Sequence, residues 1–344
     1  MKKRLKFLDR FLTLWIFAAM ITGVVIGYLF PSIADSINLV SSGTTNIPLA
    51  IGLILMMYPP LVKIDFKQLS AVLAKPKLLG LSFIVTWIVG PLLMCLLAVL
   101  FLPNDPDYLT GLIIIGIAPC IAMVIVWNEL AEGNRELTAG LVGINSLLQI
   151  AFFSLYAYFY LEVVLPLFGI KGLHIYTTIS EIAATVGIYL GIPFGAALIS
   201  RWFILKAKGE TWLLTRFIPT ISPITLIALL GTIVVMFCLK GKMIIELPMD
   251  VLKVALPLVL YFCIMFTLMF FTAKYFGASY KENVALSFTA AGNNFELAIA
   301  VSIGVFGINS GQAFTGVIGP LVEVPILILL VRVIGYWRTR YYSN

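Results

Sequence analysis

Residues 109–130 read LTGLIIIGIAPCIAMVIVWNEL, an apolar run interrupted in its middle by GIAPC at residues 116–120. A second run, VALSFTAAGNNFELAIAVSIGVF at residues 284–306, is interrupted by AGNNFE at residues 291–296. About 20 apolar residues are needed for a helix to cross a bilayer, so each run is long enough. Proline and Gly-Asn pairs break the helical hydrogen-bond ladder. The two runs therefore predict transmembrane helices that are broken near their centres.

The composition of the whole chain excludes a soluble protein. Of its 344 residues 61% are hydrophobic and 11% are charged, whereas soluble domains carry roughly 25% charged residues. The mean hydropathy is +1.06, which leaves too little polar surface to cover a globule in water. The net charge of +7 comes from Lys and Arg at the ends of apolar runs, not from one basic face. We expect a lipid bilayer as the surroundings and no nucleic acid partner.

The chain contains ten candidate membrane spans. We place them at residues 11–30, 47–64, 78–102, 109–130, 137–165, 179–200, 218–239, 253–272, 284–306 and 314–335. If the N-terminus is cytoplasmic, 19 of the 23 Lys and Arg residues fall on cytoplasmic segments. The positive-inside rule then places both termini in the cytoplasm. Residues 1–10 carry five basic residues before the first span and no small-residue cleavage site follows, which indicates a retained helix.

Spans 4 and 9 align with an offset of 174 residues, which places Cys120 on Asn294. The same offset, without a gap, places Gln149 of span 5 on Glu323 of span 10. This predicts two five-helix repeats, residues 1–170 and 171–344, and they are inverted because five is odd. Interrupted helices at matching positions of inverted repeats indicate the binding site of a transporter. The alternative is that the breaks are kinks that only help the helices pack.

Both breaks lie near the middle of the bilayer. Cys120 and Asn294 are each about 15–16 Å from the end of their span at 1.5 Å per residue. Because spans 4 and 9 enter from opposite faces, we expect the broken helices to cross. The broken positions are Gly116, Pro119 and Gly292. The crossing would bring together the candidate binding residues, which are Cys120, Asn293, Asn294 and Glu296.

Cys120 directly follows Pro119, a residue that suits the first turn of a helix. The thiol would then lie at the N-terminus of the second half-helix, where the helix dipole favours a thiolate. A soft sulfur ligand suits a thiophilic solute. On spacing alone, a buried structural cysteine is nearly as good an explanation. The other cysteines, Cys95, Cys238 and Cys263, lie in apolar stretches and are interpreted as small core residues.

Glu296 is an acid near the centre of a span. A carboxylate there costs about 2.5 to 3.5 kcal/mol on insertion scales and normally faces the protein interior or a pathway, which favours a functional role over a structural one. Burial favours the neutral acid, and ionisation on contact with water would make Glu296 a proton carrier. Glu323 also lies in the middle of its span, and Asn145 and Gln149 of span 5 could hydrogen-bond into the same region. These three are candidates for support of the site.

The motifs GIAPCIAMVIVWN at residues 116–128 and AAGNNFELA at residues 290–298 resemble the arsenite efflux permeases of the arsenical-resistance family. This family belongs to the bile acid:sodium symporter-like superfamily, and the resemblance covers the entire chain. It implies a multi-pass plasma membrane antiporter that exports arsenite, sometimes antimonite, by using the proton gradient. It also implies that Cys120 binds the arsenic, a metalloid, and that Glu296 is the functional glutamate of span 9.

The same resemblance implies ten spans in two inverted repeats with a panel domain and a core domain. We expect spans 3, 4, 5, 8, 9 and 10 in the core and spans 1, 2, 6 and 7 in the panel. The implied partners are arsenite, protons and the lipid bilayer, and no cofactor is implied. A soluble protein partner is left open.

Two other classes of function stay open. A sodium-coupled organic-anion symporter of the bile acid branch would share the fold and use Asn293, Asn294 and Glu296 as oxygen ligands for sodium. An intramembrane enzyme would need a nucleophile with a base, or a metal cluster. The chain has a single histidine, His174, in a predicted loop, and it lacks HExxH, GxSxG, P-loop and GxGxxG motifs. We therefore expect no enzyme.

Overall fold

The computed structural model describes residues 12–42, 45–64, 73–169 and 179–342. The basic N-terminal residues 1–10, the predicted repeat boundary at residue 170 and His174 lie outside the described residues. The regular secondary structure of the described residues is helical, with one hairpin of two-residue strands, β1 (Ser41–Ser42) and β2 (Thr45–Asn46). No helix or strand was predicted between residues 30 and 47, where the structure has this hairpin and α3 (Pro31–Leu39).

The helical elements follow the predicted spans, and in their labels η marks a short π-helical stretch. In the first half they are α2 (Leu12–Leu29), α4 (Ile47–Val62), α6 (Pro76–Phe83), η1 (Ile84–Val89), α7 (Gly90–Phe101), α8 (Pro106–Gly116), α9 (Met123–Leu130), α10 (Arg135–Tyr158), η2 (Phe159–Val164) and α11 (Leu165–Leu167). In the second half they are α12 (Ile179–Val186), η3 (Gly187–Gly191), α13 (Ile192–Trp212), η4 (Leu213–Phe217), α14 (Ile218–Glu246), α15 (Pro248–Tyr275), α16 (Tyr280–Ala291), α17 (Phe295–Phe306) and α18 (Gly311–Tyr341).

Five of the described helical stretches are long and apolar enough to cross a membrane on their own. They are Pro76–Phe101, Arg135–Leu167, Ile179–Gly241, Pro248–Tyr275 and Gly311–Tyr341. The stretch Ile179–Gly241 contains two predicted spans, and its chain reverses at Gly209, whose φ of +79° is not helical. Shorter apolar helices include Pro106–Gly116 and Phe295–Phe306, which are halves of the two interrupted runs. These features define a multi-pass membrane protein.

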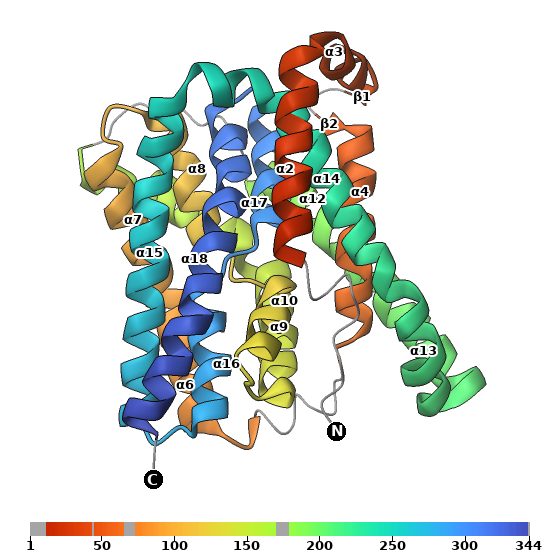
Figure 1. The fold of residues 1–344 in the computed structure, drawn as a ribbon, viewed down its shortest axis with the longest axis vertical. Helices are drawn as coiled ribbons and strands as arrows, with labels where there is room; N and C mark the ends of the chain where they lie inside the picture. The colour runs from red at the N-terminus through yellow and green to blue at the C-terminus, as the bar shows by residue number, and fades with distance from the viewer. Residues whose placement is uncertain (1–11, 43–44, 65–72, 170–178, 343–344) are drawn as a thin grey trace.

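The helices pack in two groups (Figure 1). The four-helix group consists of α2, α4, α13 and α14, with α14 against both α2 and α4. The core group is built around the broken helices and consists of α7, α8, α9, α10, α15, α16, α17 and α18. The helix α12, which forms the start of the sixth predicted span, packs on α10 and α17 of the core group. α12 therefore lies between the two groups, which also touch directly where α4 contacts α17 and α2 contacts α18.

Glycines bring α2 and α14 into direct contact. A Cβ atom at Gly27 would lie 2.0 Å from the backbone oxygen of Cys238, and one at Gly23 would lie 2.6 Å from the backbone oxygen of Val234. Real Cβ atoms do not approach backbone oxygens so closely. Small residues at such positions let helix backbones approach in membranes, where van der Waals contact stabilises packing.

We expect Gly27→Ala to destabilise the four-helix group. The added methyl would push α2 away from α14, and overpacking of this kind typically costs about 1–3 kcal/mol. Gly231→Ala is the matched control, because a Cβ at Gly231 of α14 meets no atom of the described residues within 4 Å, apart from the backbone of its own helix. The measurement is the melting temperature of each purified variant in detergent. Equal melting temperatures for the two variants would show that the α2–α14 contact does not limit the stability of the protein.

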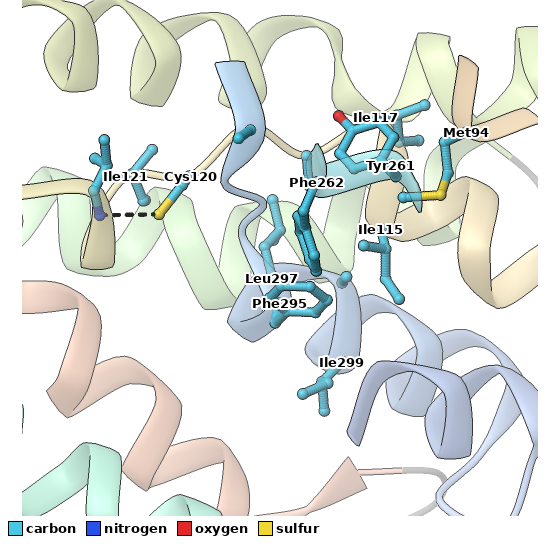
Figure 2. Close-up of a cluster of buried hydrophobic side chains, with 14 of the residues drawn as sticks. Met94, Ile115, Ile117, Cys120, Ile121, Tyr261, Phe262, Phe295, Leu297 and Ile299 are labelled. Carbon is cyan, nitrogen blue, oxygen red and sulfur yellow. Dashed lines mark hydrogen bonds between the residues drawn. The ribbon is translucent and has the colours of Figure 1, made fainter. Parts of the chain in front are cut away.

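Aromatic and aliphatic side chains fill the space around the broken helices (Figure 2). Phe262 of α15 and Phe295 at the start of α17 form an edge-to-face pair with ring centroids 6.3 Å apart. Both rings are buried, as are Ile115 and Met94 nearby. Edge-to-face aromatic pairs add to the free energy of burial. The aromatic pair therefore fixes the start of α17 within the core group, one residue before Glu296.

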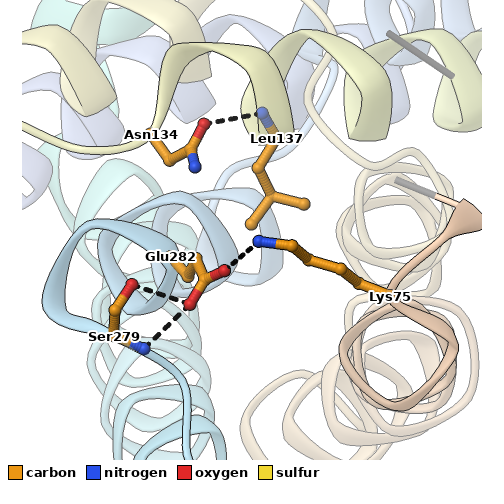
Figure 3. Close-up of polar contacts among 5 residues, drawn as sticks. All are labelled: Lys75, Asn134, Leu137, Ser279 and Glu282. Atoms are coloured by element: carbon orange, nitrogen blue, oxygen red, sulfur yellow. Dashed lines mark hydrogen bonds and ion pairs between the residues drawn. The ribbon is translucent and has the colours of Figure 1, made fainter. Parts of the chain in front are cut away.

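Polar contacts hold helix ends together at one end of the core group (Figure 3). The ammonium of Lys75, just before α6, pairs with the carboxylate of Glu282 in α16. That carboxylate also accepts hydrogen bonds from the amide and hydroxyl of Ser279. Partial burial alone would raise the pKa of Glu282, but Lys75 and Ser279 outweigh it and hold the pKa below its usual value. The Asn134 side chain similarly caps α10 by accepting from the Leu137 amide.

Candidate transport site

The structure brings the two helix breaks together. In one run α8 ends at Gly116 and α9 begins at Met123, and in the other α16 ends at Ala291 and α17 begins at Phe295. The two linkers run antiparallel and form a bridge between Pro119 and Asn293. Backbone groups freed by the breaks are therefore satisfied by each other, which is a requirement at membrane depth.

Two backbone hydrogen bonds close this bridge. The Cys120 amide donates to the Gly292 carbonyl at 3.0 Å, and the Asn294 amide donates to the Ala118 carbonyl at 2.6 Å. A shift of the residue numbers by 174 turns Cys120 into Asn294 and Gly292 into Ala118, so each of the two hydrogen bonds is the repeat equivalent of the other. The same shift turns Pro119 into its bridge partner Asn293. The crossing point is thus symmetric in its backbone, although its side chains differ.

Cys120 lies in the first linker, before the helix starts. The predicted first helical turn at Pro119 is wrong, because the pairing with the second linker keeps these residues extended and α9 begins only at Met123. The Cys120 sulfur nevertheless accepts a hydrogen bond from the Val124 amide at 3.3 Å. The thiol therefore lies at the N-terminal end of α9, with 1% of the residue exposed.

Amide side chains hold the crossing from both sides. Asn294 donates to Gln149 Oε1 at 2.8 Å and accepts from the Leu297 amide at 3.1 Å. Gln149 of α10 donates to the Pro119 carbonyl. Asn293 donates to the Ile115 carbonyl at 2.9 Å. These amides are therefore engaged in positioning the two linkers.

We expect Gln149→Leu to lower both stability and transport. Leucine has a similar size but leaves the buried Pro119 carbonyl and Asn294 amide without partners, at a cost of about 1–3 kcal/mol each. Ser146→Ala is the control, because among the described residues the buried Ser146 hydroxyl donates only to the Val142 carbonyl, within α10. The melting temperature and the rate of substrate uptake are measured for both. A Gln149→Leu protein as stable and active as the control variant would contradict this role.

Glu296 and Glu323 line a cavity of about 30 Å³ between the two helix groups. Its other walls are mainly apolar side chains of α2, α4 and α14 on one side and of α9, α17 and α18 on the other. Glu296 is half-buried, whereas Glu323 is only 3% exposed. Glu323 Oε1 has no hydrogen-bond partner in the part of the chain that the structure describes. A buried acceptor without a partner suits a ligand that donates a hydrogen bond.

Gly292 separates Cys120 from Glu323. A Cβ atom on Gly292 would lie 3.0 Å from the Cys120 Cβ and 3.4 Å from Glu323 Oε1. Cys120 itself does not line the cavity. The thiol and the two carboxyl groups thus occupy one region, and the thiol lies behind the cavity wall in this conformation.

Asn145 is placed elsewhere. Its Oδ1 accepts a hydrogen bond from the Trp87 indole at 3.0 Å, so this predicted support residue connects α10 to η1. Sequence reasoning also missed three methionines that line the cavity, Met56, Met123 and Met236. Two of them lie on α4 and α14, far from both motifs in the sequence. Within the described residues no three His, Cys, Asp or Glu side chains form a cluster that could hold a metal ion.

A predominantly helical membrane protein with two broken helices that meet beside a cavity has the architecture of a secondary transporter. Comparison with known proteins specifies the family. The model of the Sodium Bile acid symporter family matches residues 50–247. The chain is 43% identical over 341 residues to the arsenical-resistance protein Acr3 of Corynebacterium glutamicum, covering 99% of this chain and 92% of that protein.

Two further relatives cover the same length. The arsenical-resistance protein Acr3 of Alkaliphilus metalliredigens is 32% identical, with 99% of this chain and 95% of that protein covered. An uncharacterized transporter of Synechocystis is 33% identical, with 98% and 91% covered. The chain therefore belongs to the Sodium Bile acid symporter family and, within it, to the Acr3 arsenical-resistance proteins. The resemblance found in the two sequence motifs is confirmed.

Proposed function

We propose that the protein extrudes arsenite from the cytoplasm in exchange for protons. The observation that carries this proposal is the grouping of one thiol, Cys120, with two carboxyl groups, Glu296 and Glu323, where the two broken helices meet. The names of the Acr3 relatives support arsenical resistance as the physiological role. A soft thiol provides affinity for the metalloid, and an acid provides a proton-binding group.

We further propose ten spans in two inverted repeats, residues 1–170 and 171–344, with both termini cytoplasmic. The repeat is supported by the two bridge hydrogen bonds, because a shift of the residue numbers by 174 turns each bond into the other. The contacts of Lys75 with Glu282 and of Arg338 with Glu132 gather basic residues at one end of the core group. Such an end is expected to face the cytoplasm.

The four-helix group corresponds to the panel and the core group to the core of this proposal. Movement of one against the other would expose the crossing first to the cytoplasm and then to the outside. The observed cavity of about 30 Å³ has room for roughly two water molecules. Uptake of substrate therefore requires the groups to separate from the arrangement seen here.

Arsenite is expected to travel as the uncharged trihydroxide. When the site opens, the Cys120 thiol replaces one hydroxide of the arsenic, forming an As–S bond and releasing water. Hydrolysis reverses the step on the other side. A single thiolate bond can be reversed more readily than a cage of three, which suits a carrier. Glu296 takes up a proton when the outward-facing site releases the metalloid, and it loses the proton to the cytoplasm.

Sodium-coupled organic-anion transport remains the second candidate because of the family name. Three observations favour arsenite over it. The Asn294 oxygen is already occupied by the Leu297 amide, the cavity is small, and two carboxyl groups line it. A bulky anion would have to approach these acids.

Everted membrane vesicles test the proposal directly. Arsenite uptake is measured under an imposed proton gradient, under a sodium gradient and with neither, and vesicles without the protein serve as control. We expect accumulation with the proton gradient, interior acidic, and loss of accumulation when an ionophore collapses it. Accumulation that requires sodium would favour the symporter, and absence of arsenite uptake would refute the proposal.

A further inference from the structure

The cavity between the two helix groups has a lining that the two sequence motifs do not explain. Three of the chain's 11 methionines face it: Met56 of α4, Met236 of α14 and Met123 at the start of α9. Met56 and Met236 are 1% and 4% exposed. Cys120 is not part of the lining. A solute that enters the cavity therefore meets thioether sulfur and carboxyl groups before it can meet the thiol.

The lining combines two chemical features. Thioethers are soft, polarisable groups on flexible side chains that adapt to the shape of what they contact. Glu323 provides a buried oxygen, Oε1, that lacks a partner among the described residues and can accept a hydrogen bond. A neutral trihydroxide of a trivalent metalloid offers both complements, a soft central atom and O–H donors. Charged oxyanions are disfavoured because Glu296 and Glu323 share the cavity.

We propose that this cavity is a substrate subsite separate from the Cys120 adduct. Once the two groups have moved apart enough to admit it, the cavity holds the trihydroxide of arsenic or antimony through contacts with Met56, Met123 and Met236 and through an O–H···O bond to Glu323. The inference rests on the proposed function and adds a second position to it. No covalent bond forms at the subsite, since a thioether has no proton to lose.

The arrangement also favours release. Met56 and Met236 belong to the four-helix group and Met123 belongs to the core group. Further separation of the groups, beyond what admits the substrate, would therefore remove part of the soft lining from it. Because antimony is larger and more polarisable than arsenic, the three methionines should favour antimonite more than arsenite.

The test compares two triple variants in everted vesicles. Met56→Leu, Met123→Leu and Met236→Leu together keep size and hydrophobicity but remove the sulfur atoms. Met57→Leu, Met265→Leu and Met269→Leu form the control, because these methionines are buried and do not line the cavity. Uptake of arsenite is measured with antimonite as competitor, so that translocation of antimonite is not required.

The cavity variant is the triple change at Met56, Met123 and Met236. We expect the ratio of its inhibition constant for antimonite to its KM for arsenite to rise about three- to tenfold. The same ratio should be unchanged in the control variant. Unchanged inhibition in the cavity variant, or no inhibition of the wild-type protein by antimonite, overturns the subsite. An equal loss of affinity for both metalloids also overturns it, because that outcome indicates packing. Should the triple variant not fold, the single changes Met56→Leu and Met236→Leu give the same comparison. Wild-type protein without arsenite uptake would instead refute the proposed function.

Discussion

Cys120→Ser is expected to reduce arsenite efflux to the level of cells without the protein, while the variant still folds. Serine fits where the thiol lies and can accept the hydrogen bond from the Val124 amide that the sulfur accepts at 3.3 Å. It cannot supply a soft ligand for arsenic. Resistance of cells to arsenite, and uptake by everted vesicles at matched protein level, are the measurements. Melting temperature in detergent shows whether the fold is retained.

The other cysteines provide matched controls. Cys95 and Cys238 are buried and Cys263 is partly exposed, and all three are free thiols. Serine at any of these positions should leave arsenite efflux near the wild-type level, with a modest loss of stability at the buried ones. If cells with Cys120→Ser grow in arsenite as well as the wild type at normal expression, the thiol has no part in transport.

Glu296→Gln is expected to abolish accumulation of arsenite driven by the proton gradient. Glutamine mimics the neutral acid and cannot release a proton, so the coupling step is removed while the size of the side chain is kept. The efflux of a neutral trihydroxide moves no charge, and the proton gradient acts only through a coupled proton. Downhill exchange of arsenite for arsenite should persist, because it requires no change in protonation. Vesicle uptake with and without a gradient separates the two activities.

Glu323→Gln is the comparison for this variant. Its carboxyl group lines the same cavity but is almost completely buried, so the two acids can be tested under the same conditions. Accumulation by Glu296→Gln at the wild-type rate and with the wild-type pH dependence would exclude Glu296 as the coupling group. Glu323 would then be the group to test for coupling.

The apolar runs were sufficient to predict where most helices lie. The GIAPC and AGNNFE sequences also predicted that spans 4 and 9 are broken, because proline and Gly-Asn pairs interrupt helices by local chemistry. The start of α9 at Met123 was not predictable from Pro119 alone, since the pairing of the two linkers decides it. Local propensity cannot report a contact between segments that are 174 residues apart.

The candidate site was likewise predictable from the sequence only in part. Cys120 and Glu296 stand out in sequence because a thiol beside a break and an acid inside a span are both unusual. The methionines of the cavity do not stand out, because a methionine on an apolar helix is normally a packing residue. Only the approach of α4 and α14 to the core group places Met56 and Met236 beside the acids.

The symmetric backbone at the crossing carries an asymmetric set of side chains. The 174-residue offset pairs Cys120 with Asn294, Gln149 with Glu323 and Ala122 with Glu296. If an ancestral half-length chain was duplicated, its two copies kept the same hydrogen-bonded crossover and then diverged at each position that bears chemistry. One copy retains the sulfur and the other retains both acids. Neither half alone would contain both the thiol and the acids, so under the proposed function the coupling of metalloid export to protons would depend on the union of the two copies.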